Sequence, residues 1–220
     1  MKRIFLVDDH PMLREGLRRL ITQISDCQVC GEAATSADAL EAVPRLLPDL
    51  VVMDISLPDK NGLELLKDFQ CLVPDVRILV FSMHDEMLYA ERVVRAGAKG
   101  YLMKGAAAEK ITEAIERVLT GGHHLSERVS THLLNCLSNN RLPGQVGQVG
   151  VERLTDRELE IFELIGRCRT TGQIADQLNI SPRTVDAHRS NIKAKLGLPD
   201  APALIREAVL WIELAGNQPV

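Results

Sequence analysis

The sequence has few aromatic side chains and no long apolar segment, and these shortages narrow what the protein can be. Only 3% of its 220 residues are aromatic, with a single tryptophan. No apolar run approaches the roughly 18 residues of a membrane-spanning helix, so no membrane partner is expected. The apolar segment within residues 1–7 is too short for a secretory signal peptide, and acidic residues follow it directly. A cytoplasmic location is therefore expected.

Cysteines are also few and scattered, which argues against a complete metal site built from thiols. Cys27 and Cys30 alone have the C-x-x-C spacing of redox pairs and half zinc sites. No second cysteine or histidine pair lies near them in the sequence. Because a free thiol packs like a small apolar side chain, Cys30 is interpreted as part of the core.

What the sequence does contain, over residues 1–121, is a regular alternation of short apolar segments and helical patterns. Apolar segments of this length are typical of strands buried on both faces, so the pattern predicts an α/β fold with a doubly wound, five-stranded parallel sheet. Ser36 is predicted to be the N-cap of the second helix. The strands are predicted at Arg3–Val7, Gln28–Glu32, Leu50–Met53, Arg77–Phe81 and Gly100–Met103. The helices are predicted near Pro11–Ile24, Ser36–Leu47, Gly62–Gln70, Asp85–Ala96 and Ala107–Thr120.

The remainder of the chain has a different character. Residues 122–150 combine one helical pattern, Leu125–Leu137, with a glycine- and proline-containing stretch that indicates a flexible linker. Residues 151–220 are helical throughout and predict a small all-α domain of four helices. Capping boxes begin at Thr155 and Thr170, and Ser181 precedes a proline at a predicted helix start.

Acidic residues stand where the first and third predicted strands end. Asp8 and Asp9 follow one strand and Asp54 follows the other. Because the carboxyl ends of parallel strands form the ligand-binding edge of such sheets, these carboxylates are expected to lie together and to need a cation. Hard oxygen ligands favour Mg²⁺ or Mn²⁺, with Asp9, Asp54 and the backbone carbonyl of Ser56 as ligands, and Asp8 acting through a metal-bound water.

Two further residues complete this candidate site. Ser82 ends the fourth predicted strand and Lys104 ends the fifth. The set fits phosphoryl transfer to a carboxylate, a reaction that depends on positioning and charge neutralisation. Asp54 is the candidate nucleophile, the Lys104 ammonium would offset charge on the phosphoryl oxygens, and the Ser82 hydroxyl would donate a hydrogen bond to one of them.

Residues 1–121 resemble the receiver domain of bacterial two-component response regulators, which has a flavodoxin-like fold. The resemblance implies that a cognate sensor histidine kinase phosphorylates Asp54, and that Ser82 and Tyr101 form the switch pair. Two departures are Gly105, where many receivers have proline after the lysine, and Met83, where many have a small residue. The matching motifs are Asp8-Asp9-His10, Asp54 with Leu57-Pro58 and Asn61-Gly62, Phe81-Ser82, and Gly100-Tyr101-Leu102-Met103-Lys104.

The helical half carries a second motif, in a stretch where basic side chains outnumber acidic ones. A capped helix, Asn179 in a turn and the Ser181-Pro182 start predict a helix-turn-helix, whose second helix enters the DNA major groove. The segment resembles the LuxR-type domain of NarL/FixJ regulators through Ser181-x-Arg183-Thr184-Val185 and Lys195-Leu196-Gly197. By that resemblance Arg183, Thr184, Arg189 and Lys193 would contact phosphates, while Asp186, Ala187 and Ser190 are candidates for reading base edges.

The sequence therefore predicts a DNA-binding transcription regulator, not an enzyme, that is controlled by phosphorylation of Asp54. Expected partners are the kinase, double-stranded promoter DNA and a second copy of the chain, with RNA polymerase as a further candidate. Two alternatives stay open. One is an aspartyl-phosphate phosphatase, although such enzymes usually place an aspartate where this chain has Ser56. The other is a receiver whose helical domain binds RNA or protein.

Overall fold

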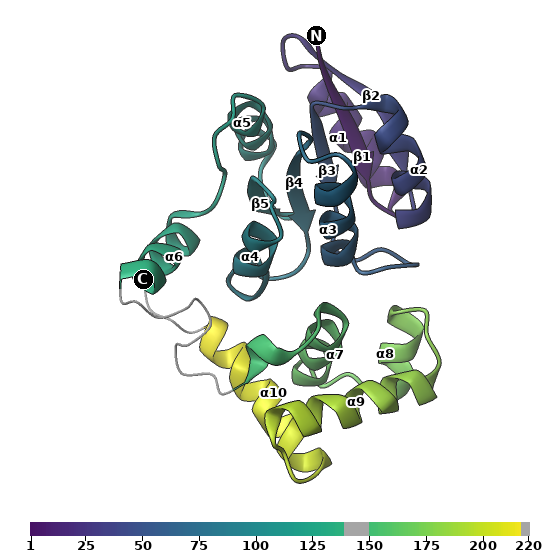
Figure 1. Cartoon of the computed structure of the whole chain (residues 1–220), viewed down its shortest axis with the longest axis vertical. Helices are drawn as coiled ribbons and strands as arrows, with labels where there is room; N and C mark the ends of the chain where they lie inside the picture. The colour runs from purple at the N-terminus through teal and green to yellow at the C-terminus, as the bar shows by residue number, and fades with distance from the viewer. Residues whose placement is uncertain (139–149, 217–220) are drawn as a thin grey trace. The chain divides into compact units, whose positions relative to one another are not determined.

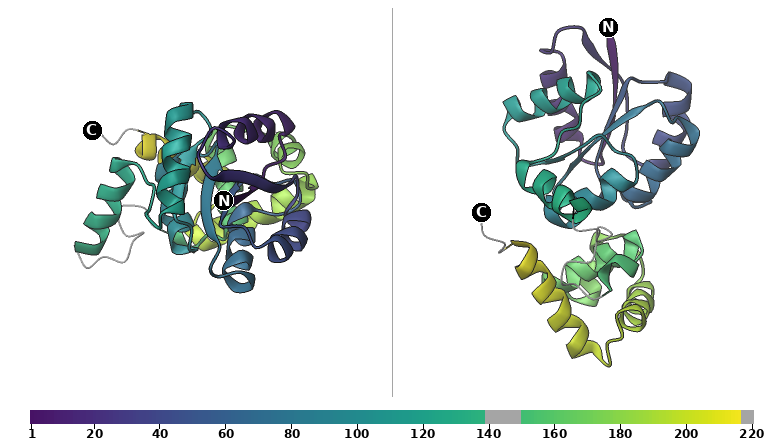
Figure 2. Two further views of the ribbon diagram at one scale, coloured as in Figure 1. Left: turned by 90° about the horizontal axis from the view of Figure 1, so that it is seen from above. Right: turned by 60° about the vertical axis from the view of Figure 1, so that its left-hand side comes forward.

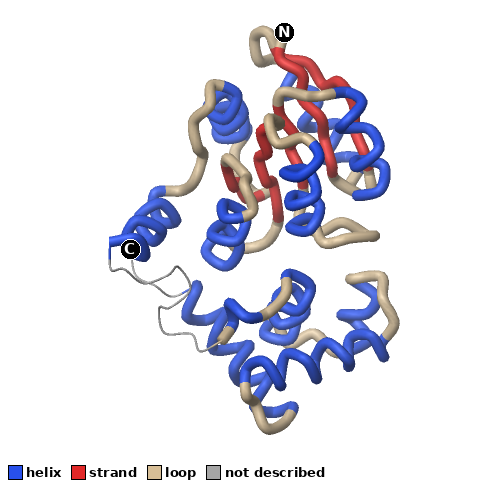
Figure 3. The backbone as a smooth tube through the Cα atoms, viewed as in Figure 1, coloured by secondary structure: helices blue, strands red, loops and turns tan. Residues whose placement is uncertain are grey.

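The structure is a computed structural model that describes residues 1–138 and 150–216; the predicted linker falls largely on residues 139–149, outside the described ranges. The chain divides into two compact units, Met1–Thr131 and His132–Val220. The division falls inside helix α6 (Glu127–Ser138), a segment that the sequence analysis grouped with the linker. In the described part of the chain, all strands belong to the first unit (Figure 1, Figure 3).

The first unit contains the predicted sheet. Its five strands are all parallel and run in the order β2-β1-β3-β4-β5, which confirms the doubly wound α/β class. This order places the ends of β1 and β3 beside each other, with β4 and β5 next in line. The strands are β1 (Lys2–Val7), β2 (Cys27–Ala33), β3 (Leu50–Met53), β4 (Arg77–Ser82) and β5 (Gly100–Met103).

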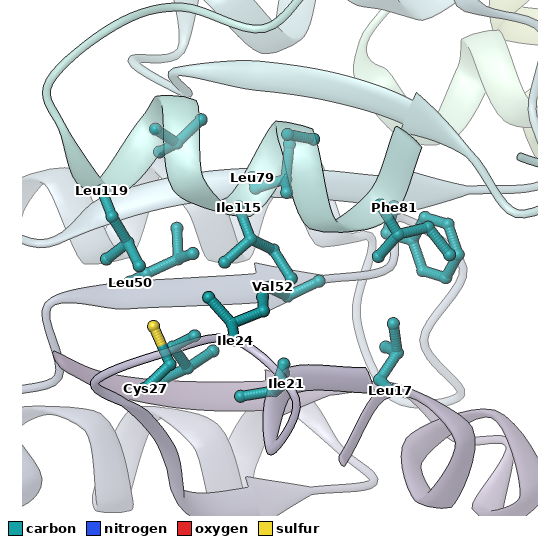
Figure 4. Close-up of a cluster of buried hydrophobic side chains, with 14 of the residues drawn as sticks. Leu17, Ile21, Ile24, Cys27, Leu50, Val52, Leu79, Phe81, Ile115 and Leu119 are labelled. Atoms are coloured by element: carbon teal, nitrogen blue, oxygen red, sulfur yellow. The ribbon is translucent and has the colours of Figure 1, made fainter. Parts of the chain in front are cut away.

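Helices cover both faces of this sheet (Figure 2). One face carries α1 and α5, whose apolar stripes pack on β1, β3 and β4 in the buried cluster drawn in Figure 4. In this view Ile115 of α5 lies near Val52 and Leu79, and Ile21 and Leu17 of α1 lie at the opposite side of the cluster. Burial of such side chains is the main driving force for this fold. The helices are α1 (Pro11–Ile21), α2 (Ser36–Leu46), α3 (Gly62–Leu72), α4 (Glu86–Arg95) and α5 (Ala108–Leu119).

The start of α2 corrects one detail of the sequence interpretation. Thr35, not Ser36, is the N-cap, and its side chain accepts a hydrogen bond from the backbone N–H of Asp38. Ser36 instead donates from its backbone N–H and its hydroxyl to the carboxylate of Asp59, at 2.9 and 2.6 Å, and the N–H of Ala37 donates to the same group. A carboxylate from the loop after β3 thus satisfies the free N–H groups of α2.

Asp59 is expected to stabilise the first unit in a pH-dependent way. Burial opposes its ionisation, but the hydrogen bonds from Ser36 and Ala37 outweigh burial and lower the pKa of the carboxyl below its usual value. The stabilisation is therefore present above pH about 4 and is lost as the pH falls through the lowered folded-state pKa. At neutral pH, Asp59→Ala should lower the free energy of unfolding by about 1 kcal/mol, as loss of a helix cap does.

Urea unfolding followed by circular dichroism at pH 7 and pH 3 measures this effect. The exposed Asp75 provides a matched control, because Asp75→Ala removes a carboxylate of the same unit that caps no helix. Equal midpoints for the two variants at pH 7 would contradict the capping role of Asp59.

The two cysteines of the C-x-x-C motif, both in β2, differ in burial. Cys27 is buried in the core, whereas Cys30 is only half-buried, so the assignment of Cys30 to the core is wrong. The pairing of β1 with β2 shifts register between Ile4 and Phe5, which leaves Cys30 unpaired at a bulge. Burial raises the pKa of both thiols, so neither has the thiolate character of a redox pair.

The described part of the second unit is helical, as predicted. Thr155 and Thr170 each form a complete capping box, and the Ser181 side chain accepts from the N–H of Thr184. Within residues 1–138 and 150–216, no helix is long and apolar enough to span a membrane. The elements are the short 3₁₀ helix η1 (Val151–Arg153), α7 (Asp156–Gly166), α8 (Thr171–Gln177), α9 (Pro182–Leu196) and α10 (Ala201–Gly216).

Candidate functional site

Three of the residues predicted from strand ends meet at the carboxyl edge of the sheet. The Lys104 ammonium lies 2.7 Å from Asp54 Oδ2 and 2.7 Å from Asp8 Oδ2. Asp8 and Asp54 are almost fully buried, so this cation stands between two carboxylates that water does not screen. The second oxygen of Asp54 accepts a hydrogen bond from the backbone N–H of Ile55 at 2.7 Å.

The charge of Lys104 is stabilised by this arrangement. Burial alone favours the neutral amine, but attraction to Asp54 and hydrogen bonds to Asp54 and Asp8 outweigh it and raise the pKa of Lys104 above its usual value. The side chain therefore stays a cation across the physiological pH range. A fixed positive charge beside Asp54 is the feature that a phosphorylated carboxylate requires, because phosphorylation adds negative charge at that point.

The carboxylates of Asp8 and Asp9 form a second part of the site together with His10. Their ligand atoms lie within 4.8 Å of one another, close enough for one metal ion. The Asp9 Oδ1 atom is shielded from solvent and lacks a well-directed hydrogen bond, although His10 Nδ1 lies 2.6 Å away. An oxygen left in this state is suited to a divalent cation, so the donor set fits Mg²⁺ or Mn²⁺.

A glycine brings helix α3 close to the backbone of Asp54. The N–H of Gly62 donates to the carbonyl of Ile55 at 2.7 Å, and a β-carbon on Gly62 would lie 2.4 Å from the carbonyl oxygen of Asp54. Asn61, whose side chain accepts from the N–H of Leu63, is the N-cap of α3. The start of α3 therefore lies so close to the backbone of Asp54 that only glycine, which has no side chain, fits at position 62.

The predicted switch residues are connected through His84, which the sequence analysis did not identify. The Tyr101 hydroxyl donates to the carbonyl of His84 at 2.9 Å, and the N–H of His84 lies 3.5 Å from Ser82 Oγ. The His84 ring contacts Ser56 Oγ through Nε2 at 2.9 Å and packs on Tyr89 at 4.5 Å between ring centroids. The loop after β4 is thus bonded both to the loop after Asp54 and to β5.

In the second unit, α8 and α9 form the helix-turn-helix that the sequence predicted. Asn179 adopts the left-handed conformation expected of the turn, with φ at 52°, and Gly197 ends α9 with φ at 65°. Val185 and Ile192 on α9 are buried. The opposite face of α9 presents Arg183, Thr184, Asp186, Ala187 and Ser190 as exposed residues, with Arg189 and Lys193 half-buried.

Several of these side chains already make bonds within the unit. Ser190 Oγ donates to the carbonyl of Asp186 at 3.0 Å, and Thr184 Oγ1 shares a hydrogen bond with Ser181 Oγ at 2.8 Å. Arg189 donates to Thr171 Oγ1 at 3.1 Å and so joins α9 to the start of α8. Of the four predicted phosphate contacts, Thr184 and Arg189 make these side-chain hydrogen bonds. In the described part of the chain, the side chains of Arg183 and Lys193 make none.

An ion pair that sequence reasoning missed holds α9 against α7. The Lys195 ammonium lies 2.6 Å from Glu158 Oε2, and the same carboxylate completes the capping box with Thr155. Burial opposes ionisation of Glu158, but hydrogen bonds from Lys195 and Thr155 outweigh it and lower the pKa of the carboxyl. The capping box was visible as a local motif, whereas the partner 37 positions away was not.

Comparison with protein families covers both units. Residues 4–116 match the response regulator receiver domain, and residues 152–208 match the family described as bacterial regulatory proteins, luxR family. The first match spans the sheet with its acidic edge, and the second spans α7, α8 and α9. The two matched ranges therefore include the acidic pocket and the helix-turn-helix.

Individual relatives match most of this chain or a part of it. The transcriptional regulatory protein MctR of Rhizobium johnstonii is 34% identical over 207 residues, which are 94% of this chain and 92% of that protein. A crystal structure of a LuxR-family two-component response regulator from Aurantimonas sp. SI85-9A1 is 38% identical, with a TM-score of 0.56 over 59% of this chain and 92% of that one.

A third comparison extends over both units. RcsB from Salmonella enterica serovar Typhimurium, bound to promoter rprA with the phosphomimetic BeF₃⁻, has a TM-score of 0.62 and covers 94% of this chain and 98% of that one. Its identity of 24% shows a shared fold alone. The matches to both families and to a full-length relative show that this chain belongs to the two-component response regulators that join a receiver domain to a LuxR-type DNA-binding domain.

Proposed function

We propose that this protein is a transcription regulator whose DNA binding is controlled by phosphorylation of Asp54. The observation that carries the proposal is the contact of Lys104 with both Asp54 and Asp8 in a buried pocket, in a chain that also has an exposed α9 face rich in polar and basic residues. A sensor histidine kinase is the proposed donor and a promoter duplex the proposed target. Because the proposed target is promoter DNA, we propose that the protein acts in the cytoplasm.

In the proposed reaction, a carboxylate oxygen of Asp54 attacks the phosphorus of a phosphohistidine, and the bond from phosphorus to the histidine nitrogen breaks. The Ile55 N–H and the Lys104 ammonium hold the carboxylate in place before the attack. A Mg²⁺ or Mn²⁺ ion held by Asp9, Asp54 and the Ser56 carbonyl, and by Asp8 through a metal-bound water, would neutralise charge on the transferred group. The remaining protein contribution is positioning, which is the main source of rate in this chemistry.

The signal is proposed to leave the pocket through Ser82. Its hydroxyl would turn toward a phosphoryl oxygen, which removes it from the weak contact with the His84 N–H. The Tyr101 hydroxyl donates a hydrogen bond to the carbonyl of His84, so a movement of the loop after β4 would reach β5. Phosphorylation favours one arrangement only if its bonds to the phosphoryl group are better there.

The output proposed for the second unit is recognition of two half-sites by a dimer. One small helical domain buries little DNA surface, so paired recognition helices are needed for specific binding. Selection of bound duplexes from a random pool, with and without a small-molecule phosphodonor, tests this function. Enrichment of a two-part sequence that depends on the phosphodonor is expected; no enrichment from any pool would count against it, and contact with RNA polymerase would be sought afterwards.

A phosphatase is the principal alternative, and Ser56 argues against it. A serine hydroxyl is a poor acid or base near neutral pH, and this one is bonded to the His84 ring. Catalytic turnover of a small phosphoester, with release of more than one phosphate per chain, would favour the phosphatase.

Metal binding at the acidic pocket is expected to depend on Asp9. Asp9→Ala removes the carboxylate whose Oδ1 atom accepts no well-directed hydrogen bond and is a proposed ligand of the ion, so the affinity for Mg²⁺ should fall at least about tenfold, the scale seen when metal-site groups are removed. Isothermal titration of the unphosphorylated protein measures this affinity without any reaction. Asp75→Ala is the control with the same change in net charge, and equal affinities for both variants would exclude Asp9 as a ligand.

A further inference from the structure

A short segment after α5 extends the parallel sheet of the first unit. The N–H of His124 donates to the carbonyl of Lys99 at 2.9 Å, and the N–H of Tyr101 donates to the carbonyl of His124 at 2.9 Å. Gly100 and His124 form a parallel bridge. Since β5 is the last strand of the sheet, this segment, residues 123–125, closes an edge whose backbone groups would otherwise face solvent. We call it the edge segment.

The edge segment can pack against β5 only because position 100 is a glycine. A β-carbon on Gly100 would lie 2.8 Å from the carbonyl oxygen of His124 and 2.8 Å from Leu79 Cδ1. Real side chains do not approach a backbone oxygen so closely, so any larger residue at position 100 would push the edge segment away from β5. The close approach of the two backbones is therefore specified by the sequence, although no local pattern at His124 indicates a strand.

The edge segment is the connection between α5 and the rest of the chain. On one side, Gly121 turns the chain with φ at 91°, and the N–H of Gly122 returns to the carbonyl of Arg117 at 2.9 Å. On the other side, Ser126 Oγ accepts from the N–H of Val129 at 3.2 Å and so caps α6. A shift of the edge segment would therefore move the start of α6, which leads to the second unit.

Room for such a shift exists beside the segment. A pocket of about 550 Å³ opens between β5, α5 and residues 124–126, with Tyr101, Lys110, Glu113 and His124 in its lining. The His124 Nδ1 atom is shielded from solvent without a hydrogen-bond partner, and burial lowers the pKa of its ring. The side chain thus lies neutral against the pocket and is not anchored there by a hydrogen bond of Nδ1.

Tyr101 is bonded both to the loop after β4 and to the edge segment. Its hydroxyl is bonded to His84, in the loop that the proposed switch moves, and its backbone N–H is bonded to His124. We propose that the edge segment is the mechanical link from the phosphorylation pocket to the DNA-binding unit, and that the two backbone hydrogen bonds of His124 transmit the movement of Tyr101 to α6. This inference rests on the proposed function, because it specifies the route of the same signal.

The link is tested with the full-length chain by two variants that open the edge segment. His124→Pro removes the N–H that bonds to Lys99, and Gly100→Ala forces the segment off its seat. For each variant, phosphoryl incorporation at Asp54 from acetyl phosphate is measured by mass spectrometry, and affinity for a selected duplex is measured with and without acetyl phosphate. Both variants should be phosphorylated to the wild-type extent, while the gain in affinity on phosphorylation falls to less than about twofold.

Two matched controls separate the backbone route from other effects. His124→Gln keeps the backbone N–H and a polar side chain, and Gly16→Ala adds a methyl group whose carbon would have no atom within 4 Å outside its chain neighbours and the local backbone of α1. Both should keep the wild-type gain. A full gain in His124→Pro and Gly100→Ala would overturn the proposal, and so would loss of the gain in His124→Gln.

A measurement on the wild type keeps the proposal testable if the opened variants do not fold. Hydrogen exchange at the amides of Tyr101 and His124 should change by at least about tenfold on phosphorylation, because both amides donate the bonds of the link. Unchanged exchange at both amides, in a protein whose DNA affinity does respond, would overturn the link while leaving the proposed function intact. A wild type that is phosphorylated but never changes its DNA affinity would instead contradict the proposed function.

Discussion

Asp54→Asn is expected to abolish phosphorylation of the chain and, with it, the phosphorylation-dependent gain in DNA binding. Asparagine keeps the shape of the side chain and can still accept the Ile55 N–H, but its amide oxygen is not a nucleophile at neutral pH. Phosphoryl incorporation from acetyl phosphate should therefore fall at least about 100-fold, because covalent transfer requires an activated nucleophile at that position. Mass spectrometry of the intact chain measures the incorporation directly.

A suitable control is another carboxylate of the same strand region. Asp49 lies at the opposite end of β3, where its carboxylate is bonded to Lys2 at 2.8 Å and to the N–H of Arg3 at 2.9 Å. Asp49→Asn changes the net charge by the same amount and should leave phosphorylation unchanged. Incorporation in Asp54→Asn equal to that in Asp49→Asn would show that the phosphoryl acceptor is a different residue.

The second large effect is expected on the recognition helix. Arg183 is exposed and Lys193 half-exposed on α9, and both are proposed to contact DNA phosphates. Each phosphate contact that is lost should reduce the slope of log affinity against log salt concentration by about 0.9. The double variant Arg183→Ala, Lys193→Ala should therefore bind all duplexes more weakly, and its salt dependence should be shallower by about 1.8.

Ser190→Ala is the contrasting variant for the same helix. Its side chain is proposed to read a base edge, so its removal should alter the preferred sequence while leaving the salt slope unchanged. Fluorescence anisotropy at several salt concentrations distinguishes the two effects. A salt slope for the double variant equal to that of the wild type would remove Arg183 and Lys193 from the interface.

Much of the first unit could be predicted because its rules are local. Each strand was visible as a short apolar segment, and parallel strands joined by helices bring their carboxyl ends to one edge. Asp8, Asp54 and Lys104 were therefore expected to converge, and the structure places the Lys104 ammonium 2.7 Å from each carboxylate. The helix-turn-helix was predicted for the same reason, since caps and turn residues act within a few positions of the helix that they begin or end.

The contacts that the sequence did not reveal are those between segments with no shared local motif. Asp59 satisfies the start of α2 from a loop 23 positions away, a contact that no residue near Ser36 indicates in the sequence. The pairing of His124 with β5 depends on the absence of a side chain at Gly100, a condition visible only once the two backbones are adjacent. Cys30 was assigned to the core because a free thiol packs like a small apolar side chain, and the bulge that leaves Cys30 unpaired in β2 has no local signal in the sequence.

The central claim is that the state of Asp54 sets the affinity of the second unit for DNA. The most direct measurement is the dissociation constant for one selected duplex, determined by anisotropy on wild-type protein with and without full phosphorylation of Asp54. A phosphorylated chain should bind between about 5-fold and 150-fold more tightly, the range of coupling typical between two sites in one protein. Equal dissociation constants for the two forms, with phosphorylation verified on the same samples, would contradict the account.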